Sequence, residues 1–150
     1  MDSGSAIELS KYRLDQANNC LLAAENNNES GFYKDALNRS YYCIFHSIRA
    51  VLAFDFYDSK KHSGIISEFH KSYIKTGLFD KHFSVVIRKS FQIRNRSDYE
   101  DFYIVAKEDV VQQLKDARAL NLHASTAYDT AEYAIDILDE TIDVISSVYD

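Results

Sequence analysis

The chain has 150 residues, of which 46% are hydrophobic, as expected for one globular domain with a single core. Two cysteines without close spacing exclude a disulfide framework, and the composition offers no apolar leader or membrane span, so we expect a cytoplasmic protein. The net charge of -6 is unevenly distributed along the chain. Residues 60–96 contain nine Lys and Arg and two acids, whereas residues 106–150 contain three Lys and Arg and ten acids. The basic window either meets phosphates or is a solvated face balanced by an acidic helix.

The spacing of apolar residues indicates helices throughout the first hundred residues. No proline occurs, and the four glycines lie between periodic stretches. Apolar steps of three and four residues predict a first helix around residues 14–24, closed by ENNNESG, and a long second helix over about residues 32–54 with Ser30 as N-cap. A short third helix follows at residues 65–73. A fourth begins after Asp80 and runs into the stretch FQIRNRSDYEDFY.

Residues 110–149 predict two further helices. The segment NLHAST interrupts the pattern, and Thr126 with Asp129 resembles a capping box that starts a new helix. The apolar positions expected to face inward on this last helix are Ala131, Ala134, Leu138, Ile142 and Ile145. The sequence therefore predicts one all-α domain over residues 1–150: an up-and-down bundle of four to five helices (about residues 6–122) with an additional C-terminal helix (about residues 125–149).

The second helix carries polar side chains where a core helix would be apolar. They lie on two neighbouring strips: Asn38, Tyr42, Phe45 and Arg49 on one, and Arg39, Cys43 and His46 on the other. Such strips can line a cleft. The structural alternative is that Arg39 pairs with Asp35 and that His46 forms a hydrogen bond within the bundle. For Cys43 we expect a buried, inert thiol.

The stretch FQIRNRSDYEDFY allows two interpretations. Each of its arginines has an acid four residues later: Arg94 has Asp98, and Arg96 has Glu100. Such pairs are typical of a salt-bridged helix surface. However, an amide and two phenols also recur at four-residue steps beside Arg94: Asn95, Tyr99 and Tyr103. A face of this kind can hold a phosphate or stack a base.

Three histidines of the basic window, His62, His70 and His82, lie eight and twelve residues apart without clustered carboxylates or thiols. This spacing does not match a metal site. We expect these histidines at the solvated surface.

Three blocks occur in a specific order: ALNRSYYCIFHSIRA, then KKHSG with ISEFHKSYIKTG, then IRNRSDYEDFY. Over roughly Leu14 to Leu120 this order resembles the HEPN family of small helical nucleotide-binding domains. The chain is similar in particular to compact prokaryotic HEPN proteins that are paired with a minimal nucleotidyltransferase as toxin and antitoxin. The resemblance implies a helical bundle, a homodimer, and a composite cleft where the motif helices of two protomers meet.

The resemblance also implies site residues. Ribonuclease members of the family carry an arginine followed, four to six residues later, by a histidine; the arginine holds the scissile phosphate and the histidine moves protons without metal or cofactor. On this chain Arg94 is the motif arginine and Asn95 the polar residue after it, while Tyr99 stands at the histidine position. We expect further phosphate or RNA contacts from Arg39, Tyr42 and His46.

The tyrosine at position 99 limits the expected chemistry. A phenol has an ordinary pKa near 10, against about 6.5 for an imidazole, which makes tyrosine a poor general base at neutral pH. We therefore expect binding of RNA or nucleotide with weak or no metal-independent ribonuclease activity. The alternatives are a non-catalytic module that docks a partner nucleotidyltransferase, and nucleotide binding without RNA. Some family members are modified with AMP on a tyrosine, but the matching position here is Asp101.

The C-terminal helix lies beyond the region of resemblance. Its apolar stripe needs a partner surface, so we expect it to pack on the bundle or to extend the dimer interface.

Overall fold

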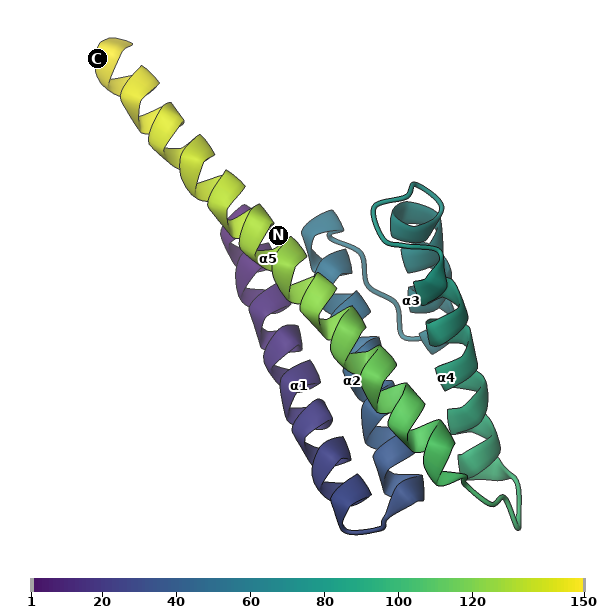
Figure 1. Cartoon of the computed structure of the whole chain (residues 1–150). Coiled ribbons are helices and arrows are strands. Elements are labelled where there is room, and N and C mark those ends of the chain that lie inside the picture. Colours follow the sequence, from purple (N-terminus) through teal and green to yellow (C-terminus); the bar gives the residue numbers. More distant parts are fainter. Residues whose placement is uncertain (1, 150) are drawn as a thin grey trace.

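The computed structural model describes residues 2–149, which form a bundle of α-helices with one helix projecting far beyond it (Figure 1). Its elements are α1 (Ser3–Glu29), α2 (Tyr33–Leu52), the 3-10 turn η1 (Ala53–Asp55), α3 (His62–Phe69), the π-helical turn η2 (His70–Ile74), α4 (His82–Tyr99) and α5 (Lys107–Tyr149). No strand occurs within this part of the chain. The predicted all-α bundle is confirmed.

Helices α1 and α2 form an antiparallel hairpin with a short connection. The polar run ENNNE does not end α1 as expected, because the helix continues through it to Glu29. Gly31 then adopts φ +81, a left-handed conformation that glycine accepts without strain. The predicted N-cap at Ser30 is wrong: Phe32 precedes α2, and no side chain caps the helix.

The second helix is the centre of the bundle and packs against α1, α4 and α5. The apolar side chains that the sequence places inward on α2 are all buried: Leu37, Tyr41, Ile44, Ile48, Val51 and Leu52. Buried polar contacts add to this packing. Gln113 of α5 donates to the Leu37 carbonyl (3.0 Å) and the Ser40 hydroxyl (2.7 Å), and so fixes the register of α5 on α2.

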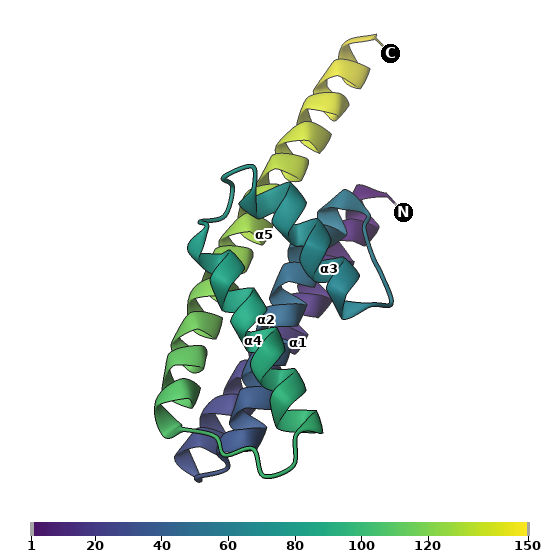
Figure 2. The ribbon, with the colours of Figure 1, turned by 90° about the vertical axis from the view of Figure 1, so that its right-hand side faces the viewer.

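Helices α3 and α4 cover another side of α2, and the turn η2 between them contacts α4 (Figure 2). The buried side chains of α3 are Ile65 and Phe69. On α4, Phe83, Val86 and Ile87 are buried. Asp80 accepts a hydrogen bond from the His82 backbone N–H (2.8 Å) at the start of α4, close to the predicted cap. This arrangement brings the first residue of α3 and the later turns of α4 to the same side of α2.

The expected break at residues 121–126 is wrong, because α5 runs without interruption from Lys107 to Tyr149. Thr126 does not cap a new helix; its hydroxyl donates to the Leu122 carbonyl one turn back (3.0 Å), a contact that fits within a continuing helix. No glycine or proline in this segment ends the helix either. The predicted C-terminal helix is therefore the continuation of the fifth helix.

The last part of α5, residues 129–149, projects away from the bundle, and we refer to it as the C-terminal arm (Figures 1 and 2). Its apolar positions continue, at alternating steps of three and four residues, the seam that packs α5 on the bundle. This seam is apolar except for Asn121: Val110, Leu114, Ala117, Asn121, Ala124, Tyr128, Ala131, Ile135, Leu138, Ile142 and Ile145. Leu138 is 59% exposed and Ile142 57%. Of the two alternatives expected for this segment, packing on its own bundle is therefore wrong, and extending the dimer interface stays a prediction. None of the helices within residues 2–149 is both long and apolar enough to cross a membrane.

Candidate functional site

The motif arginine lies in a pocket of tyrosine rings between α4 and α2. Arg94 is held by the Tyr42 hydroxyl, which accepts from Nη2 (3.2 Å), and its guanidinium carbon lies 5.6 Å and 5.7 Å from the ring centres of Tyr41 and Tyr42. Its Nε lies 3.1 Å from Asp98 Oδ2, but the N–H does not point at the carboxylate, so this contact is an ion pair without a hydrogen bond. Arg94 is thus a half-buried cation with hydrogen-bonding capacity left over.

A second cation joins Arg94 on the same tyrosine. The guanidinium carbon of Arg39 lies 5.0 Å from the centre of the Tyr42 ring, and its Nη2 donates to Asn38 Oδ1 (2.8 Å). No ion pair between Arg39 and Asp35 occurs in the described part of the chain, so that structural alternative is not supported. Cations of α2 and α4 therefore both contact one aromatic ring.

The two remaining motif residues are placed differently. Asn95 lies next to Arg94 and accepts a long hydrogen bond from its Nη1 (3.4 Å). Tyr99, at the last residue of α4, is 77% exposed and has no hydrogen bond within residues 2–149. The structure thus brings Arg94, Asn95, Tyr42 and Arg39 into contact, whereas the Tyr99 side chain is exposed one turn further along α4 and makes no hydrogen bond or aromatic contact with them among the described residues. Arg96 pairs with Glu100 at the surface (3.3 Å), as its spacing predicts.

His46 lies half-buried on α2, one turn after Tyr42, with the two ring centres 5.9 Å apart. Its Nδ1 is buried without a hydrogen-bond partner among the described residues, contrary to the expectation of a hydrogen bond within the bundle. Burial, reinforced by the charges of Arg49, Arg13 and Arg39, lowers the pKa of His46 to about 4. The imidazole is neutral at pH 7.

This pKa predicts a pH-dependent stability. Between pH 6.5 and 4 the unfolded chain protonates His46 while the folded chain does not, so the free energy of unfolding falls as the pH falls through this window. After allowance for solvent screening we expect a loss of roughly 1 to 2 kcal/mol. Urea denaturation at several pH values measures it. His46→Gln flattens the slope, whereas His70→Gln, at the exposed surface, leaves it unchanged; equal slopes in all three proteins would contradict the assignment.

The structure adds a residue that we expected at the solvated surface. His62, the first residue of α3, shares a hydrogen bond of 2.7 Å between its Nδ1 and the Tyr41 hydroxyl. Its ring stacks on Phe45, with the ring centres 4.0 Å apart. We call Arg94, Arg39, Tyr41, Tyr42 and His62 the Arg94 cluster. The signal for His62 was present in the sequence, since KKHSG is one of the three blocks that carry the family resemblance.

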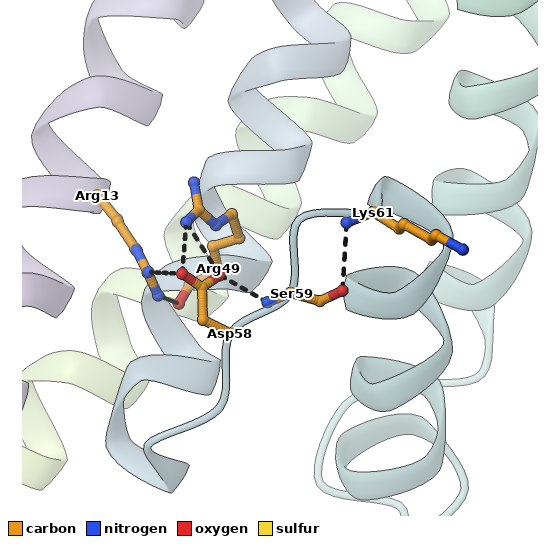
Figure 3. Close-up of polar contacts among 5 residues, drawn as sticks. All are labelled: Arg13, Arg49, Asp58, Ser59 and Lys61. Atoms are coloured by element: carbon orange, nitrogen blue, oxygen red, sulfur yellow. Dashed lines mark hydrogen bonds and ion pairs between the residues drawn. The ribbon is translucent and has the colours of Figure 1, made fainter.

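The loop that leads into α3 is tied to α1 and α2 through Asp58 (Figure 3). Its carboxylate accepts two hydrogen bonds from Arg49 Nη2 (3.0 and 3.2 Å) and lies 3.3 Å from Arg13 Nη2. Asp58 also accepts from the Ser59 backbone N–H (2.8 Å), and the Ser59 hydroxyl accepts from Lys61 N–H (3.2 Å). These contacts fix the backbone directly before His62.

A cavity of about 350 Å³ opens between α3, η2 and α4 beside the Arg94 cluster. Its lining is largely apolar, with serines and basic side chains at its sides: Ile66, Ile74, Ile87, Phe91, Ser63 and Arg88. The Phe91 ring centre lies 6.1 Å from that of Tyr41, so Phe91 lines the cavity and also contacts the aromatic part of the cluster. Such a cavity suits a flat, apolar ring next to an anion.

Other chemistry has little support in the structure. Cys43 is fully buried, as expected, and burial raises the pKa of its thiol to about 12, which keeps it protonated and unreactive. Among residues 2–149, no three His, Cys, Asp or Glu side chains lie together in a way that could hold a metal ion. The Arg94 cluster is therefore the main candidate site.

Comparison with known proteins gives consistent matches. A family model described as the HEPN domain matches residues 10–125. A Methanocaldococcus jannaschii protein named "Putative toxin MJ0142" is 34% identical over 102 residues, which cover 68% of this chain and 69% of that protein. An Archaeoglobus fulgidus protein named "UPF0332 protein" is 31% identical over 117 residues, covering 78% of this chain and 93% of its own. A second M. jannaschii protein, "Putative toxin MJ0605", is 37% identical over 71 residues, or 47% of this chain and 53% of that protein.

The family match spans most of the chain and includes every residue of the Arg94 cluster, from Arg39 to Arg94. It ends shortly before the C-terminal arm begins. The predicted resemblance is confirmed, and the chain belongs to the HEPN domain family.

Proposed function

We propose that this protein is the HEPN member of a toxin–antitoxin type module. It binds RNA or nucleotide at a composite cleft in a homodimer, with weak or no metal-independent ribonuclease activity. Relatives named as toxins support the biological class. The Arg94 cluster supports the ligand class, because a phosphate favours an arginine that is already oriented. Arg39 adds a second cation, and the neighbouring cavity offers Phe91 for stacking a base.

The observation that carries this proposal is the way Arg94 is held. Two tyrosine rings and the Tyr42 hydroxyl fix its guanidinium, so little side-chain entropy is lost when a phosphate binds. Arg96, two residues later, is 59% exposed and engaged with Glu100 on the helix surface. Arg94 also has an acidic partner, Asp98, but of these two arginines it is the one that contacts the tyrosine rings of α2.

Arg94→Ala is expected to weaken RNA binding by about 10- to 100-fold, the range for losing charge-assisted hydrogen bonds to a phosphate. Fluorescence anisotropy with a labelled single-stranded RNA at one fixed salt concentration measures the change. Arg96→Ala is the matched control, since it removes the same charge from the same helix. It should cost less than about threefold, because an exposed, paired arginine contributes little. Equal losses in the two variants would mean that general electrostatics, and not a site at Arg94, attracts RNA.

A second candidate function is a non-catalytic module that docks a partner nucleotidyltransferase. The C-terminal arm favours it: the arm presents an apolar stripe, and residues 119–149 contain six acids and no Lys or Arg. A surface of this composition suits a partner with apolar side chains rimmed by cations. Light scattering on the purified protein, alone and mixed with a nucleotidyltransferase from the same genome, separates a homodimer from a hetero-complex. An unchanged mass in the mixture would exclude this function for the enzyme tested.

A further inference from the structure

We propose that His62, and not Tyr99, is the proton-accepting catalytic residue for RNA cleavage at the Arg94 cluster. This inference rests on the proposed function, since it needs RNA bound at Arg94. Tyr99 occupies the motif position in the sequence, but in the structure it lies exposed at the end of α4. The imidazole of His62 contacts the cluster from a different helix, α3, and we assign to it the role that the motif histidine has in ribonuclease members of the family.

The contacts of His62 place it beside Arg94. Tyr41 links the two side chains: its hydroxyl is 2.7 Å from His62 Nδ1, and its ring lies 5.6 Å from the Arg94 guanidinium carbon. The Tyr42 ring, whose hydroxyl accepts from Arg94, is also 6.0 Å from the His62 ring. Arg94 and His62 thus contact the same two tyrosines, and the proposal places the 2′-hydroxyl of an RNA bound at Arg94 within reach of the imidazole.

Two contacts restrict the His62 ring, and the hydrogen bond to Tyr41 allows either tautomer. Stacking on Phe45 and the bond to Tyr41 leave the imidazole little freedom to rotate. When Nδ1–H donates to the Tyr41 oxygen, Nε2 carries the free lone pair, and no contact within residues 2–149 occupies it. Burial, followed by the charges of Arg94 on α4 and Arg49 on α2, lowers the pKa of His62, so the ring is neutral and able to take a proton at pH 7.

The reaction needs no further group. His62 Nε2 takes the proton of the RNA 2′-hydroxyl, and the 2′ oxygen forms a bond to phosphorus while Arg94 holds the phosphate. The bond between phosphorus and the 5′ oxygen breaks, giving a 2′,3′-cyclic phosphate, and the departing 5′ oxygen takes a proton from water. His62 then returns its proton to the hydroxide that is left. Because water, and not a positioned acid, protonates the leaving group, cleavage is expected to be slow.

The test is cleavage and binding of one labelled single-stranded RNA in EDTA, with the 2′-O-methyl RNA as the uncleavable control. We expect slow wild-type cleavage that yields a 2′,3′-cyclic phosphate. His62→Ala should lower the rate by about 10² or more, with RNA affinity changed less than threefold. Added imidazole should restore part of this loss, which a purely structural role would not allow. Tyr99→Phe and His82→Asn should cleave at the wild-type rate.

Four results would overturn the proposal. They are wild-type protein that binds RNA through Arg94 but does not cleave it, full activity in His62→Ala, loss of activity in Tyr99→Phe, or no rescue by imidazole in a folded His62→Ala or His62→Gly protein. Circular dichroism checks folding, and the pH–rate profile gives a second readout, whose acid limb disappears with His62. If no RNA binds in an Arg94-dependent manner, the proposed function itself fails, and the affinity measurement shows this separately from cleavage.

Discussion

Asp58→Ala is expected to lower the free energy of unfolding by about 1 to 2 kcal/mol, less than the loss of a partner from a fully buried pair, because the Asp58 side chain is 55% exposed whereas Arg13 is buried. The side chain of Arg13 is only 5% exposed, and burial together with the charge of Arg49 disfavours its ionised form. Asp58 offsets that cost and also holds the loop before α3. Its loss leaves a buried cation without a counter-charge and frees the backbone that places His62. Urea denaturation at pH 7 measures the change.

Glu100→Ala provides the matched comparison, since it also removes a carboxylate from an arginine. Arg96 and Glu100 are both more than half exposed, so this substitution should cost no more than about 0.5 kcal/mol. Burial alone would raise the pKa of Asp58, but Ser59 N–H and the two arginines outweigh it and hold the pKa below 3.8. The stabilisation by Asp58 is therefore present at neutral pH and lost only as the pH falls below that value. Similar losses in Asp58→Ala and Glu100→Ala would show that Arg13 is not dependent on Asp58.

Leu120→Ala is expected to cost about 2 to 5 kcal/mol, the range for removing a fully buried leucine side chain. Leu120 is 0% exposed and belongs to the main core that α5 completes against α2 and other helices. The substitution opens a cavity that the surrounding side chains cannot fill by relaxation. Thermal or urea unfolding followed by circular dichroism measures the loss.

Leu138→Ala makes the same chemical change on the same helix, in the C-terminal arm. With its side chain 59% exposed, it should change stability by less than about 0.5 kcal/mol in a monomer. Running both variants at two protein concentrations adds a test of assembly. A cost for Leu138→Ala that grows with concentration would show that the arm is covered by another copy, whereas a large cost at every concentration would contradict its exposure in the protomer.

The helices of the bundle could be predicted because their burial follows local periodicity. Leu37, Tyr41 and Ile48 recur at helical steps and all face the core. The end of the fifth helix could not be predicted in this way. Thr126 has the chemistry of an N-cap, but its hydroxyl is equally able to bond a carbonyl one turn back, and no glycine or proline decides against the helix. The apolar stripe of the arm also could not reveal that nothing in its own bundle covers it.

The site was predictable only in part, for a related reason. Spacing along one helix placed Arg94 with Asp98, and that ion pair exists. The contact between Arg94 and Tyr42 joins residues 52 positions apart and depends on how α4 packs on α2. His62 likewise reaches Tyr41 only through the packing of α3. Spacing therefore gave the ion pair and the family resemblance gave Arg94 and Tyr42 as site residues, whereas the contacts among Arg94, Tyr41, Tyr42 and His62 required the tertiary structure.

Because α5 is one uninterrupted helix, its free end is a rigid rod that can tilt only about the point near Tyr128 where the helix leaves the bundle. Residues 129–149 extend for roughly 30 Å at the usual rise per residue, so a tilt of 5° at that point moves the tip by about 3 Å. The same rod continues inward to Gln113, whose amide is bonded to α2, the helix that carries Tyr41 and Tyr42. The C-terminal arm is thus connected, through one continuous helix and the Gln113 hydrogen bonds, to the helix that carries the tyrosines around Arg94.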